Sequence, residues 1–538
     1  MEKRTVIAYF LFCIVLMSLV LRLYALTAGG YKSVSSYAGG GKTLILGETR
    51  GMIYDRNLSP LVNSQCKYLA CVLPTREGIA AISEKLDEGE LEVYKAQLER
   101  GSLVTFITPS SGDYAGCADI AVIPVYERYT PVTAQHIIGY LSPDGTEGAC
   151  GAELTFNELL KGYSGTVSAH YTTDALGRVL SGADAEMRNE NYASSGGIVL
   201  TLDKSIQLIC EQALTECGIT KGAAVVIDVK SGEVTGCASA PVFDRDNLGS
   251  ALGSADAPFL NRAFTEYTVG SVFKLVVAAA ALENGIDKSF SYTCTGSTQK
   301  SGTKFLCHKH SGHGTLDMRD AFALSCNTYF IELACTVGIE NVLEYAEKFG
   351  FGKAIPIFGD YVSDSGLLPE LSFFDSEASV ANLAFGQGNL LATPLQLAYA
   401  YLAAVNGGRY ECRDLLRGYV DENGVFTPSA ENDTERTIIT SETSAALREL
   451  LENTVLTGSG KAAGSELFSS GGKTATAETG RYIDGREIQN CWYVGCFPAQ
   501  SPEYVIAVLK EDGVSGSNDA APVFKMISEK IYSSQLSE

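Results

Sequence analysis

A serine and a lysine three positions apart stand at the start of an apolar segment of the chain. Ser271 and Lys274 lie in GSVFK, which is followed by LVVAAAAL and then by Glu-Asn-Gly285. This pattern predicts a helix that ends at the glycine. Because the helix is apolar on all sides, we expect it to be buried, with Lys274 in its first turn and on the same face as Ser271.

Burial of Lys274 is what would give this pair its chemistry. Desolvation disfavours the ammonium form, lowers the lysine pKa and makes the amine a base for the Ser271 hydroxyl. The helix N-terminus also favours a developing oxyanion. A capping serine beside a lysine that reaches solvent is the structural alternative, and this spacing recurs by chance in long chains. The pair alone therefore does not establish catalysis.

Two later segments change this assessment. They are Ser325-Cys326-Asn327 and Lys473-Thr474-Ala475-Thr476. In this order the three segments resemble the S-x-x-K, S-x-N and K-T-G motifs of penicillin-binding proteins and serine β-lactamases. Further ordered matches resemble the class B, monofunctional transpeptidases. Those matches are residues 50–57, 136–140, 151–153, 200–203, 206–207, 261–263, 386–388, 393–396 and 406–408.

The resemblance implies an acyl-enzyme mechanism. Ser271 attacks the penultimate D-alanine carbonyl of a peptidoglycan stem peptide and expels the terminal D-alanine. Lys274 takes the serine proton, Ser325 relays it toward the leaving amine, and Asn327 orients Lys274 and the peptide amide. An amine of a second stem peptide then resolves the acyl-enzyme and cross-links the wall. β-Lactams mimic the first step.

The resemblance also implies how the substrate is held. Lys473, with the hydroxyls of Thr474 and Thr476, binds the substrate carboxylate. The backbone N–H groups of Ser271 and Thr476 form the oxyanion hole. Ala475 departs from the family, which usually has glycine there, and adds a methyl group to the strand that the substrate backbone approaches.

Several cysteines and histidines gather between residues 294 and 313. A zinc site is one interpretation, although the spacing is irregular. Cys294-Thr-Gly296 and His313-Gly314 resemble structural features of the family, in which Cys294 and Cys307 could form a disulfide, and unpaired loop residues are the third interpretation. We expect no metal and no cofactor. The crowded residues are Cys294, Cys307, His308, His310 and His313.

Single residues outside this group carry weaker signals. Cys326, inside the second motif, is a candidate unpaired thiol in the active-site cleft. His136 and His170 are expected to be packed or solvent-facing rather than catalytic. The residue before Gly270 is Val269 where the family usually has proline, which affects only the rigidity of the turn.

The N-terminal segment predicts a membrane anchor. Residues 6–21 carry no charge and follow Lys3 and Arg4, which favour a cytoplasmic N-terminus. We expect a single-pass protein of the cell membrane, with a cytoplasmic tail at 1–4, a span at 5–26 and a linker at 27–42. The catalytic domain is expected to be extracytoplasmic. A cleaved signal peptide is the competing interpretation.

The helices and strands that the sequence predicts around the motifs indicate two α+β parts. Residues 43–195 resemble the N-terminal pedestal or dimerisation-like module, and residues 196–538 the transpeptidase domain. In the second part, Asp203 caps a helix and strands are predicted at 223–228, 234–238, 491–496 and 504–509, with long helices between them. The predicted architecture is an antiparallel sheet covered by helices.

Composition narrows the possible partners. Forty-one basic residues against 63 acidic ones give a net charge of -22, which argues against nucleic acid. Fifteen cysteines lack the regular spacing of a disulfide framework, so most are expected to be reduced and buried. There is no room upstream for a glycosyltransferase domain, so we expect a separate glycan polymerase as partner.

Two other function classes compete with cross-linking. One is a hydrolase, a D,D-carboxypeptidase or β-lactamase, in which water deacylates Ser271; the anchor and the long N-terminal module count against it. The other is a β-lactam sensor or divisome scaffold without enzymatic activity, which the intact motifs and the lack of a signalling domain disfavour. The sequence leaves open whether the protein serves division, elongation and cell shape, or sporulation.

Overall fold

The computed structural model describes most of the chain beyond the N-terminal segment. The predicted anchor lies largely outside the described residues, and its residues 14–20 are helical. Among the residues that are described, no helix is both long and apolar enough to cross a membrane. The described residues are 12, 14–20, 41–130, 132–174, 176–180, 185–245, 247–430 and 435–536.

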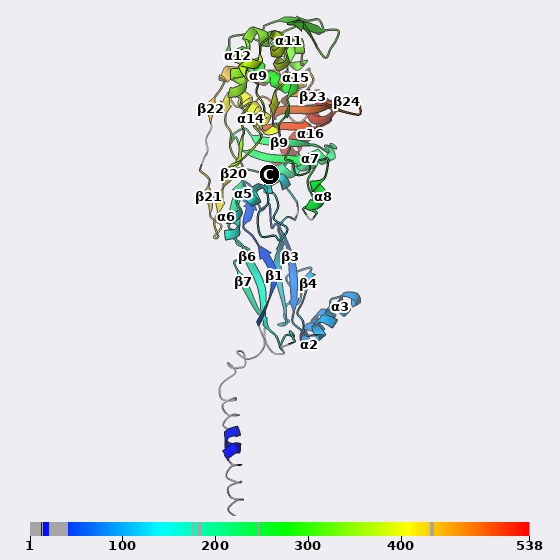
Figure 1. Ribbon diagram of the computed structural model, residues 1–538, viewed down its shortest axis with the longest axis vertical. Coiled ribbons are helices and arrows are strands. Elements are labelled where there is room, and N and C mark those ends of the chain that lie inside the picture. Colours follow the sequence, from blue (N-terminus) through cyan, green and yellow to red (C-terminus); the bar gives the residue numbers. More distant parts are fainter. Residues whose placement is uncertain are drawn as a thin grey trace, which may run out of the picture. The chain divides into compact units, whose positions relative to one another are not determined.

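The chain forms two compact units, whose helices and strands are labelled in Figure 1. Buried apolar residues form a core within each unit. The smaller unit comprises the described residues up to 50 and within 63–128 and 164–193. It contains two antiparallel three-stranded sheets. Their strand orders are β1 (Gly41–Thr49), β6 (Gly165–Thr172), β7 (Glu186–Glu190) and β4 (Val104–Thr108), β3 (Gln65–Val72), β5 (Ile120–Glu127). Helices α2 (Arg76–Ser83) and α3 (Glu88–Glu99) bury Ile82 and Leu98 against the second sheet.

The larger unit takes two segments that the sequence assigned to the N-terminal module. Residues 51–62 and 129–163 pack with residues 194–538. The physical reason is strand pairing over a long sequence separation, because β2 (Met52–Tyr54) pairs in parallel with β8 (Gly197–Leu200). The expected module at 43–195 is therefore not a single structural unit.

The predicted antiparallel sheet covered by helices is present in the larger unit. Its strand order is β10 (Val234–Ala240), β9 (Gly222–Asp228), β25 (Tyr504–Lys510), β24 (Arg486–Phe497), β23 (Gly471–Ile483). Helices α7 (Lys204–Glu216) and α16 (Ala521–Gln535) cover one face, and α14 (Pro394–Val405) packs on the other. Asp203 caps α7 as expected, since its side chain accepts hydrogen bonds from the backbone of Ser205 and Ile206.

A helical layer lies on the α14 side of this sheet and carries the first two motifs. The remaining helices of the unit are α4 (Gln135–Ile138), α5 (Gly151–Thr155), α6 (Asn157–Gly162), α8 (Leu248–Leu252), α9 (Lys274–Glu283), α10 (Met318–Ala323), α11 (Asn327–Val337), α12 (Ile339–Lys348), α13 (Glu377–Ala384) and α15 (Ser441–Leu456). The short strands of the larger unit are β11 (Tyr267–Thr268), β12 (Tyr292–Cys294), β13 (Ser297–Lys300), β14 (Thr303–Leu306), β15 (Gly314–Leu316), β16 (Pro356–Phe358), β17 (Tyr361–Val362), β18 (Leu391–Ala392), β19 (Arg409–Tyr410), β20 (Leu416–Val420), β21 (Phe426–Pro428) and β22 (Arg436–Thr437).

Candidate active site

The serine expected as nucleophile lies in a short 3-10 turn, η2 (Gly270–Phe273), directly before α9. Ser271 is partly exposed, whereas Lys274 is fully buried. All but the last two residues of α9 are buried, as its uniformly apolar sequence predicts. Ser271 is therefore accessible to a reactant, whereas Lys274 is enclosed by protein.

Two contacts from distant segments hold this turn. The backbone N–H of Gly270 donates a hydrogen bond to the carbonyl of Gly386 (2.8 Å), and the buried hydroxyl of Tyr401 donates to the carbonyl of Val272 (3.0 Å). Gly386 has a φ of +76°, and a Cβ placed there would lie 2.0 Å from the Gly270 carbonyl oxygen. Only glycine fits at such a close approach of two backbones.

Lys274 joins the first motif to the second. Its Nζ donates to the carbonyl of Ser325 (2.8 Å), to the Ser325 hydroxyl (3.2 Å) and to Oδ1 of Asn327 (2.8 Å). The structure thus brings the side chain of Lys274 to two residues of the second motif that follow it by 51 and 53 positions. These contacts fix the direction in which the amine points.

Burial sets the protonation of this amine. Desolvation lowers the pKa of Lys274 to about 7, against the smaller opposing effects of the Cys326 and Cys307 thiols. A lysine at the surface would remain protonated at neutral pH, but a large fraction of Lys274 is a free amine there. The group is suited to accept a proton from a neighbouring hydroxyl.

The loop that presents Ser325 is strained. Ser325 has a φ of +52°, a left-handed conformation that costs a residue other than glycine about 1–3 kcal/mol. The next residue, Cys326, is fully buried, and its N–H donates to the carbonyl of Ala321 (2.9 Å). Contacts on both sides of Ser325 therefore maintain the conformation that turns its carbonyl and hydroxyl toward Lys274.

The third motif lies on the edge strand of the sheet. Lys473 on β23 is fully buried, its Nζ donates to the carbonyl of Thr474 (2.9 Å), and it lies 5.9 Å from the ring centre of Phe322. Burial holds the pKa of Lys473 well below its ordinary value, and the nearby charge of Lys274 lowers it further. All three motifs thus converge on one buried region.

Comparison with known proteins agrees with this geometry. Residues 222–529 match the family described as penicillin binding protein transpeptidase domain. The chain belongs to the class B penicillin-binding proteins.

Three relatives indicate how far the similarity extends. Stage V sporulation protein D of Bacillus subtilis is 29% identical over 88% of this chain and 76% of its own length. Peptidoglycan D,D-transpeptidase PbpA of Mycolicibacterium smegmatis is 27% identical over 79% of this chain and 86% of its own. A chain from a solved peptidoglycan synthase complex that coordinates polymerization and crosslinking superposes with a TM-score of 0.68 at 24% identity, covering 98% of each chain. The last match shows the shared fold.

In this penicillin-binding protein, the two threonines of the third motif point away from Lys473. Side chains alternate along a strand, so Thr474 and Thr476 lie on the opposite face of β23. The Thr474 hydroxyl donates to the hydroxyl of Ser459 (2.8 Å), and the hydroxyl of the exposed Thr476 accepts from the N–H of Gly516 (3.2 Å). The sequence grouped these hydroxyls with Lys473, whereas the structure gives each of them a protein partner.

Ala475 shares the Lys473 face of the strand. Its side chain is only 3% exposed, and a Cβ added at Gly270 would lie 3.3 Å from the Ala475 methyl group. The additional methyl group therefore packs beneath the turn that carries Ser271, residues 270–273, here called the nucleophile turn. It does not project into solvent along the outer edge of β23, which in the described sheet pairs only with β24.

The histidines and cysteines that the sequence singled out lie in different surroundings. His136 is buried with Nε2 at 2.8 Å from the carbonyl of Pro258, and His170 lies 3.1 Å from the Thr43 hydroxyl. Cys294 and Cys307 are both free thiols, so the disulfide interpretation is not supported. The sequence treated Cys326 separately from this group, but the fold brings it to the same place.

Proposed function

We propose that this protein is a peptidoglycan D,D-transpeptidase that works through an acyl-enzyme at Ser271. The observation that carries the proposal is the buried amine of Lys274, hydrogen-bonded to Ser325 and Asn327 and placed one helical turn after a partly exposed serine. A lowered lysine pKa in this position matches the needs of a base that activates a hydroxyl.

The proposed acylation step uses these contacts. Lys274 accepts the proton of Ser271 as Oγ bonds to the penultimate D-alanine carbonyl carbon, and the N–H groups of Ser271 and Thr476 stabilise the oxyanion. As the tetrahedral intermediate collapses, the peptide C–N bond breaks. The proton returns through the Ser325 hydroxyl to the leaving amine of D-alanine, and Asn327 keeps Lys274 in line.

Lys473 supplies the recognition of a C-terminal carboxylate. A fully buried amine whose pKa burial depresses has little to stabilise its ammonium form. A substrate carboxylate at this position would pair with the ammonium and reverse the effect of burial. The hydroxyls of Thr474 and Thr476 lie on the opposite face of β23, so they would join Lys473 in binding this carboxylate only by leaving their partners Ser459 and Gly516. β-Lactams bind in the same way, because they carry an acyl group and a carboxylate.

The location of the protein and its partner belong to this proposal. The uncharged segment at 6–21, preceded by Lys3 and Arg4, supports an anchor in the cell membrane with the catalytic unit outside the cytoplasm. Similarity in fold to a chain of a synthase complex that couples polymerization to crosslinking supports a separate glycan polymerase as partner.

A fluorescent penicillin tests the acylation step. The full-length protein should form a covalent adduct, and Ser271→Ala should form none. Ser250→Ala, which removes an exposed serine hydroxyl of α8, should be acylated like the wild type. Equal labelling of the Ser271→Ala variant and the wild type, or no labelling of either, would sink the proposal.

Lipid-linked stem peptide distinguishes cross-linking from hydrolysis. With an acceptor amine present, the transpeptidase should release D-alanine and form a cross-linked product in comparable amounts. Release of D-alanine without any cross-linked product would identify a carboxypeptidase instead.

A further inference from the structure

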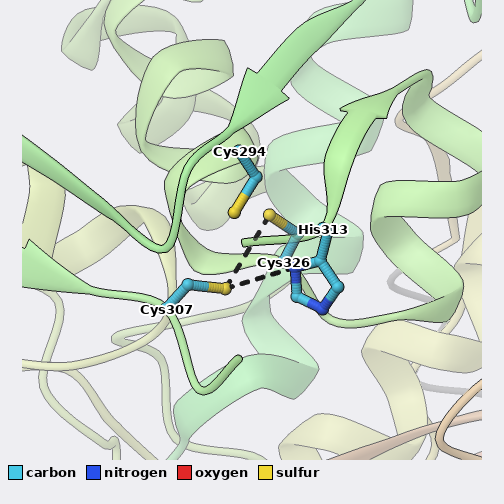
Figure 2. Close-up of side chains that lie close together, drawn as sticks. All are labelled: Cys294, Cys307, His313 and Cys326. Atoms are coloured by element: carbon cyan, nitrogen blue, oxygen red, sulfur yellow. Dashed lines mark hydrogen bonds between the residues drawn. The ribbon is translucent and has the colours of Figure 1, made fainter. Parts of the chain in front are cut away.

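Four potential metal ligands converge beside the second motif (Figure 2). The sulfur atoms of Cys294, Cys307 and Cys326 and a ring nitrogen of His313 lie within 4.8 Å of one another. Cys307 Sγ is 3.5 Å from Nδ1 of His313 and 3.9 Å from Sγ of Cys326. The three cysteines are at most 2% exposed, and only the histidine reaches the surface.

The two distances from Cys307 match the edges of a zinc tetrahedron, and the other ligand pairs lie within 4.8 Å. With zinc bonds of about 2.3 Å to sulfur and about 2.0 Å to nitrogen, tetrahedral ligands lie about 3.8 Å apart for two sulfurs and about 3.5 Å apart for sulfur and nitrogen. Three thiolates and one imidazole form a closed set of the structural type, with no position left for water. We propose that Cys294, Cys307, His313 and Cys326 bind a zinc ion that fixes the loop carrying Ser325 and Asn327.

The backbone around the cluster is arranged for this convergence. Strands β12 and β15 pair with Cys294 opposite Gly314, which brings His313 next to Cys294. Gly312 has a φ of +82°, and a Cβ there would lie 2.4 Å from the Cys294 carbonyl oxygen. The N–H of Cys307 donates to the carbonyl of Gly296 (2.9 Å). Three separate loop segments are thus held close together by their own backbones.

Hydrogen-bond donors surround the sulfurs, an arrangement that stabilises thiolates. Backbone N–H groups of Lys309 and Asn327 are directed at the Cys307 sulfur, and the Thr328 hydroxyl lies 3.4 Å from the Cys326 sulfur. Outer partners of this kind orient metal ligands and stabilise their charge. On binding, each thiol loses its proton to solvent and the sulfur lone pair forms the bond to zinc.

A disulfide explains the cluster less well. It would join two of the sulfurs and leave the third sulfur and the imidazole without a role, whereas zinc uses all four ligands. The 3.9 Å between the Cys307 and Cys326 sulfurs is also far longer than the roughly 2.05 Å of a disulfide bond.

The position of Cys326 couples the ion to catalysis. It separates Ser325 from Asn327, the two residues that accept hydrogen bonds from Lys274. The left-handed conformation of Ser325 persists only if its neighbours are held firmly. Asn327 Nδ2 also donates to the carbonyl of Leu306 (3.3 Å), next to Cys307. A zinc ion bound to the sulfurs of both Cys307 and Cys326 would link the loops that carry these two residues. Both cysteines are therefore positioning residues.

Metal content tests the site directly. The full-length protein, treated with one equivalent of Zn²⁺ and desalted, should retain about one zinc ion per chain by elemental analysis. With Co²⁺ alone it should show tetrahedral cobalt bands and thiolate charge transfer. Cys307→Ser and His313→Asn should lower the affinity for zinc at least about tenfold, since even changes to the outer partners of the ligands cost that much affinity, and should retain less zinc after desalting. Cys335→Ser, in α11 outside the cluster, should retain the ion.

A second set of measurements tests the role in positioning, which rests on the proposed function. His313→Cys restores a fourth ligand and should recover both zinc and the rate of acylation by penicillin that His313→Asn loses. Zinc returned to chelator-treated wild type should restore the same rate. No zinc in the wild type, or equal zinc in His313→Asn, overturns the site, and full acylation by the zinc-free protein overturns the positioning role. Bound zinc with no acylation of Ser271 under any condition supports the site and refutes the proposed function.

Discussion

The contact between Gly386 and the nucleophile turn allows a sharp test of how the site is held. In Gly386→Ala the new Cβ would lie 2.0 Å from the Gly270 carbonyl oxygen, so the two backbones must separate by more than about 1 Å to reach normal contact. The hydrogen bond from Gly270 to Gly386 breaks as they separate. Ser271 is the next residue and moves with the turn.

The size of the effect can be worked out by comparison with a nearby glycine. Gly388 has a φ of +84°, similar to the +76° of Gly386, so alanine at either position costs about 1–2 kcal/mol of backbone strain. At Gly388, however, the nearest atom to the added Cβ is 3.6 Å away, an ordinary contact. A displacement of 1 Å at a catalytic group costs about 100-fold in rate. Gly386→Ala should therefore be acylated about 100 times more slowly than Gly388→Ala.

The assay is the second-order rate constant for labelling of Ser271 by a fluorescent penicillin, measured on both variants and the wild type. Thermal unfolding should show a larger loss of stability for Gly386→Ala, because the clash and the broken hydrogen bond add to the backbone strain that both variants carry. Gly388→Ala should be acylated at about the wild-type rate. Equal rates for the two variants, with both folded, would refute the idea that Gly386 positions the nucleophile turn.

Three further outcomes are expected. Acylation should rise with pH and level off above about 7, because Lys274 must be neutral and burial lowers its pKa to about 7; a rate that is flat between about pH 6 and pH 8 would contradict this. Burial lowers the pKa of His136 to about 4, below its value in the unfolded chain. The free energy of unfolding should therefore fall by up to roughly 3 kcal/mol as pH decreases from about 6.5 to about 4. Urea unfolding across this range should show a smaller loss in His136→Gln, and an equal loss would count against the assignment. Ala475→Gly should lower stability by about 1–2 kcal/mol in thermal unfolding and leave acylation nearly unchanged, because the methyl group is packed under the turn; a large gain in acylation would argue that it obstructs the substrate.

The sequence predicted which motifs lie together better than it predicted the contacts that hold them in place. Ser271, Lys274, Ser325, Asn327 and Lys473 belong to short motifs in which the residue types themselves carry the chemistry. The order of those motifs was enough to suggest that they meet. The β-strand period of two also places Thr474 and Thr476 opposite Lys473, a signal that was present in the sequence and was missed.

Other features depend on contacts that no local pattern records. Gly386 and Tyr401 support the nucleophile turn through one hydrogen bond each from distant segments. The pairing of β2 with β8, which moves residues 51–62 into the larger unit, joins strands far apart in the chain. The cysteine cluster likewise depends on the register of β12 and β15, so its irregular spacing in sequence gave little indication of its geometry in space.

The two buried lysines constrain each other during the reaction. The charge of Lys274 lowers the pKa of Lys473, and electrostatic coupling between two sites is reciprocal. Both amines are buried, so the state with two ammonium ions is the least stable one in the free enzyme. In the proposed function, a substrate carboxylate would pair with the ammonium of Lys473 and so hold the single proton of the lysine pair on Lys473, which leaves Lys274 neutral. Under that proposal, recognition of the C-terminal carboxylate would keep Lys274 in the form that accepts the proton of Ser271.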